Sequence, residues 1–216
     1  METTTNGLTY NEFKDLLRKV CQDAESYKDF LTELDSAIGD GDLGITIYRG
    51  FQAVEKSLEL PHENIGQLLM RAGVDFINAA SSTGGFLIGS AIISAGKCIG
   101  DKVSISLFTF YEIVTCSEEE IREKGKAELG DKTLLDALEP IRISLKNSLE
   151  TKEPIDIALK KAYEASEQGS EATRTMRALK GRARWLGERT LGHLDPGAVF
   201  ISLIMKSIYR HCTEKL

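Results

Sequence analysis

The sequence predicts an all-α protein whose helices are joined by glycine-rich connections. Only four prolines occur among 216 residues, and the long stretches between them carry apolar residues at intervals of three and four, the spacing of an amphipathic helix. Glycines gather instead in short clusters, where we expect the chain to turn. These clusters lie at 39–44, 84–89, 125–130 and 187–197.

The N-terminal part of the chain is expected to form four helices. The first opens at Thr9, which has Glu12 three residues later in the spacing of a capping box, and it reaches toward Leu34. The next three helices are expected at 45–58, 64–80 and 86–99.

The segment 103–115 is ambiguous, because β-branched and aromatic residues alternate there as in a strand. A helix capped by Ser106 is favoured, since we expect no partner strand elsewhere in the chain. Ser117 and Glu120 repeat the capping-box spacing and predict a helix over 118–127.

Three further helices complete the expected fold, two of them at 133–151 and 155–178. The last begins at Asp195 as the N-cap, with Pro196 in its first turn. Its apolar face contains Val199, Phe200, Leu203, Ile204 and Ile208.

Composition narrows the class of protein. Hydrophobic residues make up 42% and charged residues 28% of the chain, so we expect one globular domain over 1–216 with the first several residues flexible. The net charge of −6 argues against a general nucleic-acid binder. No apolar run approaches the roughly 20 residues that span a bilayer, and the N-terminus lacks signal-peptide features. A cytoplasmic location is expected, with no membrane partner.

The four cysteines are Cys21, Cys98, Cys116 and Cys212. They are widely separated and show neither a C-x-x-C motif nor a metal-ligand spacing. We therefore expect reduced thiols.

Three carboxylates, Asp35, Asp40 and Asp42, crowd into one short glycine-rich stretch. Like charges at such separations repel, and a divalent cation would neutralise them. An all-oxygen ligand set suits Mg²⁺ or Ca²⁺ rather than zinc. Against a helix-loop-helix calcium site, Thr46 and Ile47 stand where the loop would need a bidentate glutamate. A plain solvated acidic turn remains an equal alternative.

Two further glycine-marked segments suggest contacts with a phosphorylated ligand. The stretch 81–85 places hydroxyls and unhindered amides at the start of a helix, which would suit a phosphate, although taken alone the stretch is more typical of an ordinary N-capped Ser/Gly turn. The stretch 125–136 leads into a helix and could equally be a solvated cap.

The connection 181–197 is long and dense in glycine, arginine and aromatic residues, and long ordered connections are often functional. Arg189 could hold a phosphate, and Asp195 could cap its helix or bind a ribose. His193 has no accompanying nucleophile motif and is expected to be structural. Trp185 is expected to pack against the end of the bundle. If helices alternate in direction, all four glycine-marked segments fall at one end and can form one site.

Together these segments resemble the DhaL family, the nucleotide-binding subunit or domain of dihydroxyacetone kinases. The resemblance spans nearly the whole chain. The stretches that carry it are Leu34-Asp35, Gly39-Asp40-Gly41-Asp42, 130–138, 171–176, Gly181-Arg182-Ala183 and 186–198.

The resemblance implies an eight-helix antiparallel barrel that holds ADP or ATP at one end through two Mg²⁺ ions. Asp35, Asp40 and Asp42 match the metal-binding aspartates of the family, and no catalytic side chain beyond this site is expected. The nucleotide-binding positions implied in the same way are Leu43, Thr46, Thr83, Gly84, Gly125, Leu134, Arg189, Asp195 and Gly197.

The resemblance also implies partners. In this family a separate DhaK subunit or domain holds the sugar, dihydroxyacetone or a related keto-sugar, so this chain would deliver a phosphoryl group across an interface. In one branch ADP stays bound and a DhaM phosphoprotein of the phosphotransferase system recharges it, which a free-standing chain favours. The alternatives are an ATP-dependent subunit with exchangeable nucleotide, a regulatory ADP sensor without turnover, and a degenerate paralogue without a ligand. The oligomeric state stays open, a homodimer included.

The chain departs from the family pattern beside the phosphates. Leu43 stands where a histidine is common, Thr46 replaces an asparagine, and the stretch 81–86 replaces a Gly-Gly-x-Ser-Gly-Pro turn. We therefore expect a diverged member that keeps its metal and nucleotide.

Overall fold

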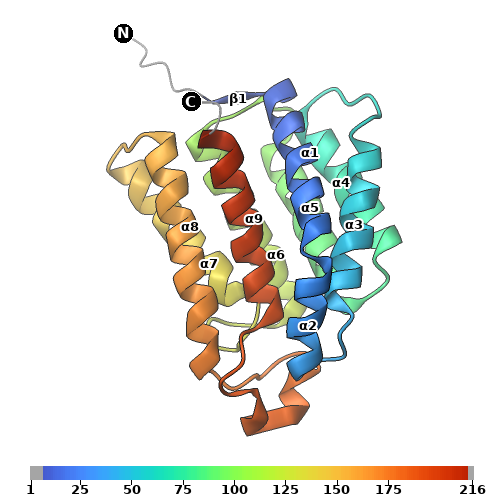
Figure 1. The fold of residues 1–216 in the computed structure, drawn as a ribbon. Helices are drawn as coiled ribbons and strands as arrows, with labels where there is room; N and C mark the ends of the chain where they lie inside the picture. Colours follow the sequence, from blue (N-terminus) through green and yellow to red (C-terminus); the bar gives the residue numbers. More distant parts are fainter. Residues whose placement is uncertain (1–6, 214–216) are drawn as a thin grey trace.

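A computed structural model describes residues 7–213, so the expected flexibility of the first several residues concerns positions outside the described range. The all-α prediction is confirmed: long helices account for most of the described chain (Figure 1). The helices are α1 (Tyr10–Ser26), α2 (Lys28–Ile38), α3 (Leu43–Ser57), α4 (Ile65–Ala79), α5 (Thr83–Ile99), α6 (Leu107–Gly125), α7 (Leu135–Glu150), α8 (Ile155–Ala172) and α9 (Pro196–Thr213).

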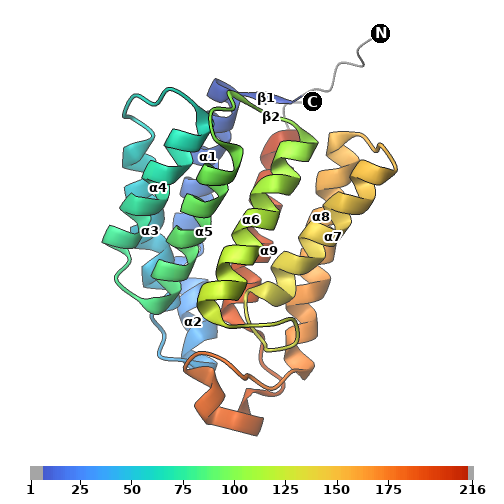
Figure 2. The same cartoon turned by 180° about the vertical axis from the view of Figure 1, so that it is seen from behind.

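The helices form a closed ring in chain order. Each of α3 to α8 packs on the next helix, α9 packs on α1, and α1 packs on α3. The two opposite views show the same up-and-down arrangement around the ring (Figures 1 and 2). Since α1 and α2 follow one another with only Tyr27 between them, they act as one column, and the described chain forms the expected eight-column barrel.

Buried leucine, isoleucine, valine, alanine and phenylalanine side chains fill the ring. Helices α4 and α5 approach closely because small residues face each other there. A methyl group added at Gly66 would stand 2.0 Å from the Gly100 carbonyl oxygen, and one at Gly73 would stand 2.6 Å from that of Gly89. An apolar cavity of about 200 Å³ remains in the interior, lined by residues such as Val20, Phe51, Leu69, Ile92, Ile113, Leu159 and Ile204.

Several expected boundaries were wrong. The first helix breaks at Tyr27, and α6 runs without interruption through Ser117, which does not begin a helix. The Ser117 hydroxyl instead donates to the Ala91 carbonyl of α5, 3.3 Å away. The helix expected over 155–178 ends at Ala172 and continues only as the 3₁₀ turn η1 (Thr173–Thr175).

The segment 103–115 is mostly helical, as favoured, and Ser106 caps α6 by accepting from the Thr109 amide. The expectation that no partner strand exists was wrong. Strand β1 (Leu8–Thr9) pairs antiparallel with β2 (Ser104–Ile105) at the end of the barrel where α1 begins and α9 ends (Figure 2). A two-residue strand is too short to produce a readable alternation.

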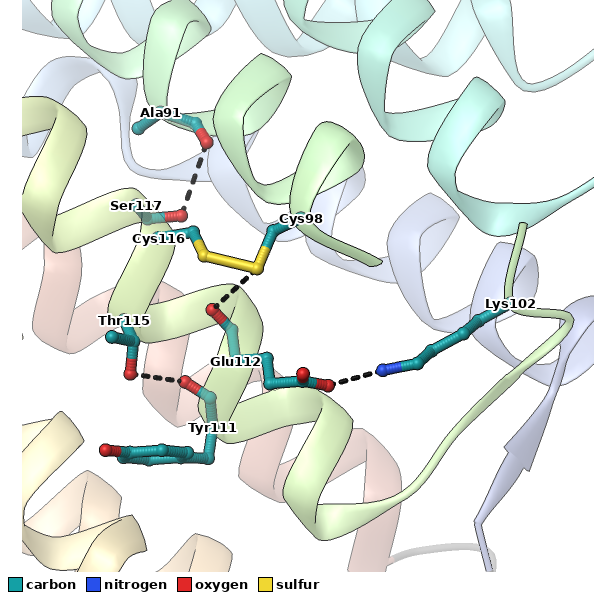
Figure 3. Close-up of a disulfide and its surroundings, with 8 residues drawn as sticks. All are labelled: Ala91, Cys98, Lys102, Tyr111, Glu112, Thr115, Cys116 and Ser117. Carbon is teal, nitrogen blue, oxygen red and sulfur yellow. Dashed lines mark hydrogen bonds and ion pairs between the residues drawn. A yellow bond between two sulfur atoms is a disulfide. The ribbon is translucent and has the colours of Figure 1, made fainter. Parts of the chain in front are cut away.

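The expectation of reduced thiols was wrong for two cysteines. Cys98 of α5 and Cys116 of α6 form a disulfide, with their Cα atoms 6.5 Å apart (Figure 3). Below it in the same figure, Lys102 pairs with Glu112 of α6. Cys21 is a buried thiol in α1.

No helix between residues 7 and 213 combines the length and apolarity needed to cross a membrane.

Candidate functional site

Four connections meet at the end of the barrel opposite β1 and β2 (Figures 1 and 2). They join α2 to α3, α4 to α5, α6 to α7, and α8 to α9. Because neighbouring columns run in opposite directions, every second connection falls at this end, as the glycine clusters suggested. We call residues 173–195 the α8–α9 segment; it includes η1 and the 3₁₀ turn η2 (Ala183–Thr190), and η2 packs on α2.

The aspartate turn brings its three carboxylates together. One oxygen each of Asp35, Asp40 and Asp42 lies within 4.8 Å of the others. The turn is tight: Gly41 has φ +74°, and the Leu43 amide donates to Asp35 Oδ2 at 3.2 Å. Burial, followed by the charges of Asp40 and Asp35, raises the pKa of Asp42. Three close oxygen donors with mutual repulsion fit a hard divalent cation.

The start of α5 lies beside this turn. Ser82 caps α5 by accepting from the Gly85 amide at 3.0 Å, and its hydroxyl also lies 3.1 Å from the Thr46 hydroxyl of α3. A methyl group at Gly84 would have Leu43 Cδ1 as its nearest neighbour, 3.9 Å away. The N-termini of α3 and α5 therefore stand side by side, with open space over the first turn of α5, an arrangement that favours an anion.

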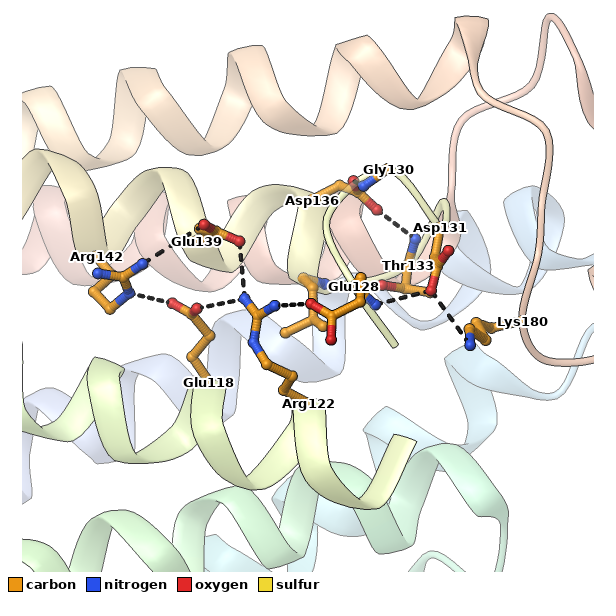
Figure 4. A network of polar contacts seen from close by, with 11 residues as sticks. Glu118, Arg122, Glu128, Gly130, Asp131, Thr133, Asp136, Glu139, Arg142 and Lys180 are labelled. Carbon is orange, nitrogen blue, oxygen red and sulfur yellow. Dashed lines mark hydrogen bonds and ion pairs between the residues drawn. The ribbon is translucent and has the colours of Figure 1, made fainter. Parts of the chain in front are cut away.

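The connection from α6 to α7 is tightly organised (Figure 4). Asp136 accepts from the Gly130 amide at 2.6 Å and from the Thr133 amide at 2.7 Å, which folds the loop back onto α7. Buried Glu118 of α6 accepts from two arginines, Arg122 and Arg142, and so ties α6 to α7 beside this loop. The loop is therefore held in one shape.

The start of α9 shows the expected cap. Asp195 Oδ2 accepts from the Ala198 amide at 2.7 Å, and the Asp195 amide donates to the Thr173 hydroxyl at 2.9 Å. Burial raises the pKa of Asp195 to about 7, the Ala198 amide opposes this, and Asp136 adds to it. A methyl group at Gly197 would stand 3.0 Å from Asp195 Oδ2 and 3.2 Å from Leu134 Cβ, so a larger residue here would require these neighbours to shift.

The α8–α9 segment reaches back to the aspartate turn. Arg182 pairs with Asp40, whereas Arg189 is exposed. The expectation that Trp185 packs against the barrel end was wrong: it is 77% exposed, with the Arg184 guanidinium over its ring. An exposed aromatic ring was not readable from the sequence, because the fold of this segment depends on distant partners.

The structure thus brings most of the expected residues into two neighbouring groups. Asp35, Asp40, Asp42, Leu43, Thr46, Thr83 and Gly84 form one, and Leu134, Asp195 and Gly197 form the other. Gly125, at the end of α6, lies nearest Leu87 of α5, at 3.8 Å from an added methyl group. Sequence reasoning included Ser82 only as part of the stretch 81–85 and Arg182 only as part of Gly181-Arg182-Ala183, and it gave neither residue a contact of its own. The first was readable as the hydroxyl three residues before Gly85, whereas the Arg182 pair joins positions 142 residues apart.

Three comparisons place the chain among known proteins. The DAK2 domain matches residues 37–210. The chain is 35% identical over 181 residues to the PEP-dependent dihydroxyacetone kinase, ADP-binding subunit DhaL, of Escherichia coli K12, covering 83% of this chain and 86% of that protein. It is also 35% identical over 187 residues to the ADP-binding subunit DhaL of PEP-dependent dihydroxyacetone kinase 2 of Listeria innocua, with coverages of 85% and 86%.

The fold is similar to that of a solved structure, the dihydroxyacetone kinase from C. freundii in complex with AMP-PNP and Mg²⁺. The TM-score is 0.70 at 24% identity, and the match covers 91% of this chain and 33% of that one. At this level of identity the likeness concerns the fold alone, and it agrees with the all-helical barrel.

Proposed function

Because the chain belongs to the DAK2 domain family, in which the DhaL subunits of dihydroxyacetone kinase lie, we propose that it is the ADP-binding phosphotransferase subunit of such a kinase. The observation that carries the proposal is the cluster of Asp35, Asp40 and Asp42 beside the first turn of α5, where the space around Gly84 is open. Carboxylates for metal and helix amides for phosphate are what a nucleoside diphosphate needs.

In this proposal the three aspartates hold Mg²⁺, two ions in all, and the metal supplies neutralisation of the phosphate charges. The residues about the phosphates are Leu43, Thr46, Thr83 and Gly84. Gly125 and Leu134 serve the base end of the nucleotide. Arg189, Asp195 and Gly197 lie close to the bound nucleotide.

The proposed phosphoryl transfer requires little general acid–base catalysis. Phosphoryl transfer depends mainly on positioning and on charge neutralisation, and this chain offers carboxylates, amides and arginines at the barrel end. The sugar, dihydroxyacetone or a related small keto-sugar, would be held by a separate DhaK-like subunit facing this end. The chain itself would act as one DAK2-type domain.

We further propose that ADP stays bound and is recharged by a DhaM-like phosphoprotein. The support is the description of the Escherichia coli and Listeria innocua relatives as PEP-dependent. An exchangeable-ATP subunit and a non-catalytic ADP sensor remain the competing functions, and the experiment below distinguishes them.

The protein is incubated with Mg²⁺ and ADP, gel-filtered, denatured, and the released nucleotide is quantified, with an EDTA-treated sample as the control. We expect near-stoichiometric ADP with Mg²⁺ and none after EDTA. Retained ADP that a phosphoprotein relay converts to ATP, followed by sugar phosphate on addition of a DhaK-like subunit, supports catalysis. Retained ADP without product supports the sensor. No retained ADP, with turnover on free ATP, supports the exchanging kinase.

A further inference from the structure

A lysine in the connection from α6 to α7 is almost completely enclosed. Lys132 is 2% exposed and has φ +59°, in the left-handed region that a non-glycine residue adopts at a cost. Its backbone is held in this conformation by neighbours on both sides, since Asp136 accepts from the amides of Gly130 and Thr133. The burial of Lys132 and its costly backbone conformation indicate that its side chain has specific partners inside the protein.

The Lys132 ammonium group is surrounded by main-chain carbonyl oxygens. They belong to Thr173 at 2.7 Å, Met176 at 3.2 Å, Thr190 at 2.8 Å and His193 at 2.5 Å. An ammonium has three N–H donors and no acceptor, so it satisfies a convergence of carbonyls that no neutral side chain of this length can satisfy. Burial lowers the pKa of Lys132, but the charges of Asp195 and Asp136 oppose that effect.

These four carbonyls come from both ends of the α8–α9 segment. Thr173 and Met176 follow α8, whereas Thr190 and His193 precede α9, so the one ammonium ties the two ends of the segment together. Between the two ends of the segment, η2 packs on α2 and Arg182 pairs with Asp40. Trp185 at its tip is 77% exposed.

Two smaller contacts strengthen the same junction. The Leu179 amide donates to the Asp131 carbonyl at 3.0 Å. Lys180 Nζ lies 3.5 Å from Asp131 Oδ2 (Figure 4). Lys132 is the member of this group that is buried and contacts four carbonyls, so its loss removes more hydrogen bonds from the junction than the loss of Lys180 or of the Leu179 contact would.

We propose that Lys132 is a positioning residue that clamps the α8–α9 segment over the aspartate turn, so that Arg182, Arg189 and Asp195 stand at the nucleotide end of the barrel. The effect on the nucleotide rests on the proposed function, whereas the clamp itself does not. Lys132 acts through the segment and does not itself touch the aspartate cluster.

The test compares Lys132→Met with a matched control, Lys180→Met, in the 216-residue chain without nucleotide. Opening of the α8–α9 segment is read by the rate of trypsin cleavage after Arg182 and Arg184, identified by fragment mass. Cleavage after Lys152, at the opposite end of the barrel, is the internal reference. Removing the buried donor is expected to speed the first cleavage at least about tenfold relative to the reference, with little change for Lys180→Met.

Trp185 is the only tryptophan of the chain, so its fluorescence anisotropy reports the same segment. We expect the anisotropy to fall in Lys132→Met and the affinity for ADP with Mg²⁺ to decrease about tenfold. A residue needed only for barrel stability would lower the melting temperature while leaving the ratio of the two cleavages and the anisotropy at wild-type values, and that result overturns the clamp.

If Lys132→Met does not fold, Lys132→Arg serves as the second test of the clamp. It keeps the charge, but a planar guanidinium cannot direct its donors to converging carbonyls as an ammonium does. Faster cleavage after Arg182 and Arg184 supports the clamp, and an unchanged cleavage ratio contradicts it. Because the cleavage and anisotropy measurements need no nucleotide, a wild-type protein that retains no ADP would refute the proposed function and leave the test of the clamp intact.

Discussion

The two ends of the barrel are built in different ways. At the end that carries β1 and β2, the connections 58–64, 100–106 and 151–154 are short and hold no cluster of metal ligands among the described residues. At the other end lie the aspartate turn, the loop folded around Asp136 and the long α8–α9 segment. Four of the six glycines with left-handed φ in the described chain belong to the last two of these connections: Gly130, Gly181, Gly187 and Gly192.

The difference indicates a division of labour. One end closes the barrel with tight contacts and a disulfide near it, and the other presents charges and unhindered amides. If the division holds, a substitution at one end should alter stability without altering nucleotide binding, and the reverse should apply at the other. The following predictions test this from the largest expected effect to the smallest.

The largest contrast is expected between two aspartates, Asp42 and Asp101. Asp42→Ala removes one of three clustered carboxylates, and we expect the affinity for ADP with Mg²⁺ to fall at least about 100-fold by calorimetry. Metal-free stability should not decrease, because the Asp42 side chain makes no capping bond to α3 and its charge is repelled by its neighbours. Asp101→Ala, in the exposed connection at the other end, should change neither quantity. Equal ADP affinity in both variants would contradict the assignment of the metal site.

The disulfide should affect stability alone. Cys98 and Cys116 close a loop of 18 residues, which corresponds to about 3 kcal/mol of stabilisation in the chain-entropy estimate. We expect Cys116→Ser to lower the melting temperature by about 6–12 °C under oxidising conditions and to match the dithiothreitol-treated wild type. ADP retention should stay unchanged. A dithiothreitol-insensitive melting temperature in the wild type would show that the bond is not formed in solution.

The sequence predicted the features that depend on near neighbours. The cap at Asp195, the helix after Ser106 and the crowding of Asp35, Asp40 and Asp42 all follow from spacings of a few residues. What it did not predict joins distant positions, such as the pairing of Arg182 with Asp40 and the disulfide across α5 and α6. Such contacts are set by how the columns pack, and no local pattern encodes that.

The carbonyl oxygens around the Lys132 ammonium group are the clearest case of this limit. They belong to backbone carbonyls 41 to 61 residues away, and a backbone carbonyl carries no signal in the amino-acid sequence. The family resemblance marks the surrounding stretch 130–138 but gives no physical role for the lysine. The break at Tyr27 is similar, since both sides of it remain helical and both pack on α3, and they differ only in distant partners such as η2, which packs on α2.

A matched pair of glycines sharpens the comparison further. In Gly66→Ala the added methyl group would stand 2.0 Å from the Gly100 carbonyl oxygen. Helices α4 and α5 would therefore have to separate at the end of the barrel that carries β1 and β2. We expect a loss of about 1–3 kcal/mol in the free energy of unfolding by urea titration and no change in ADP affinity. Gly84→Ala meets nothing closer than 3.9 Å, so it should keep full stability and weaken ADP binding by crowding the phosphate position. If both variants lose stability alone, Gly84 does not face the nucleotide.

The smallest effect is expected at the seam between α1 and α9, which belongs to neither end. Burial alone would raise the pKa of Asp23, but hydrogen bonds from the Ser207 hydroxyl and the His211 ring, with the Arg210 charge, outweigh it and hold the pKa below its ordinary value. A lowered carboxyl pKa stabilises the fold above the unfolded-state pKa of about 3.9, and this stabilisation is lost as the pH falls through the folded-state value.

Asp23→Asn should therefore lower the free energy of unfolding by about 1–2 kcal/mol at pH 7, and the difference from wild type should shrink once the pH falls below about 4. Asp15→Asn is the control, since Asp15 forms only an exposed pair with Arg18 and exposed pairs contribute little. ADP retention should be unchanged in both variants, because the seam lies away from the aspartate turn. A difference for Asp23→Asn that persists undiminished at pH 2.5 would mean that it reflects lost packing rather than the carboxylate charge.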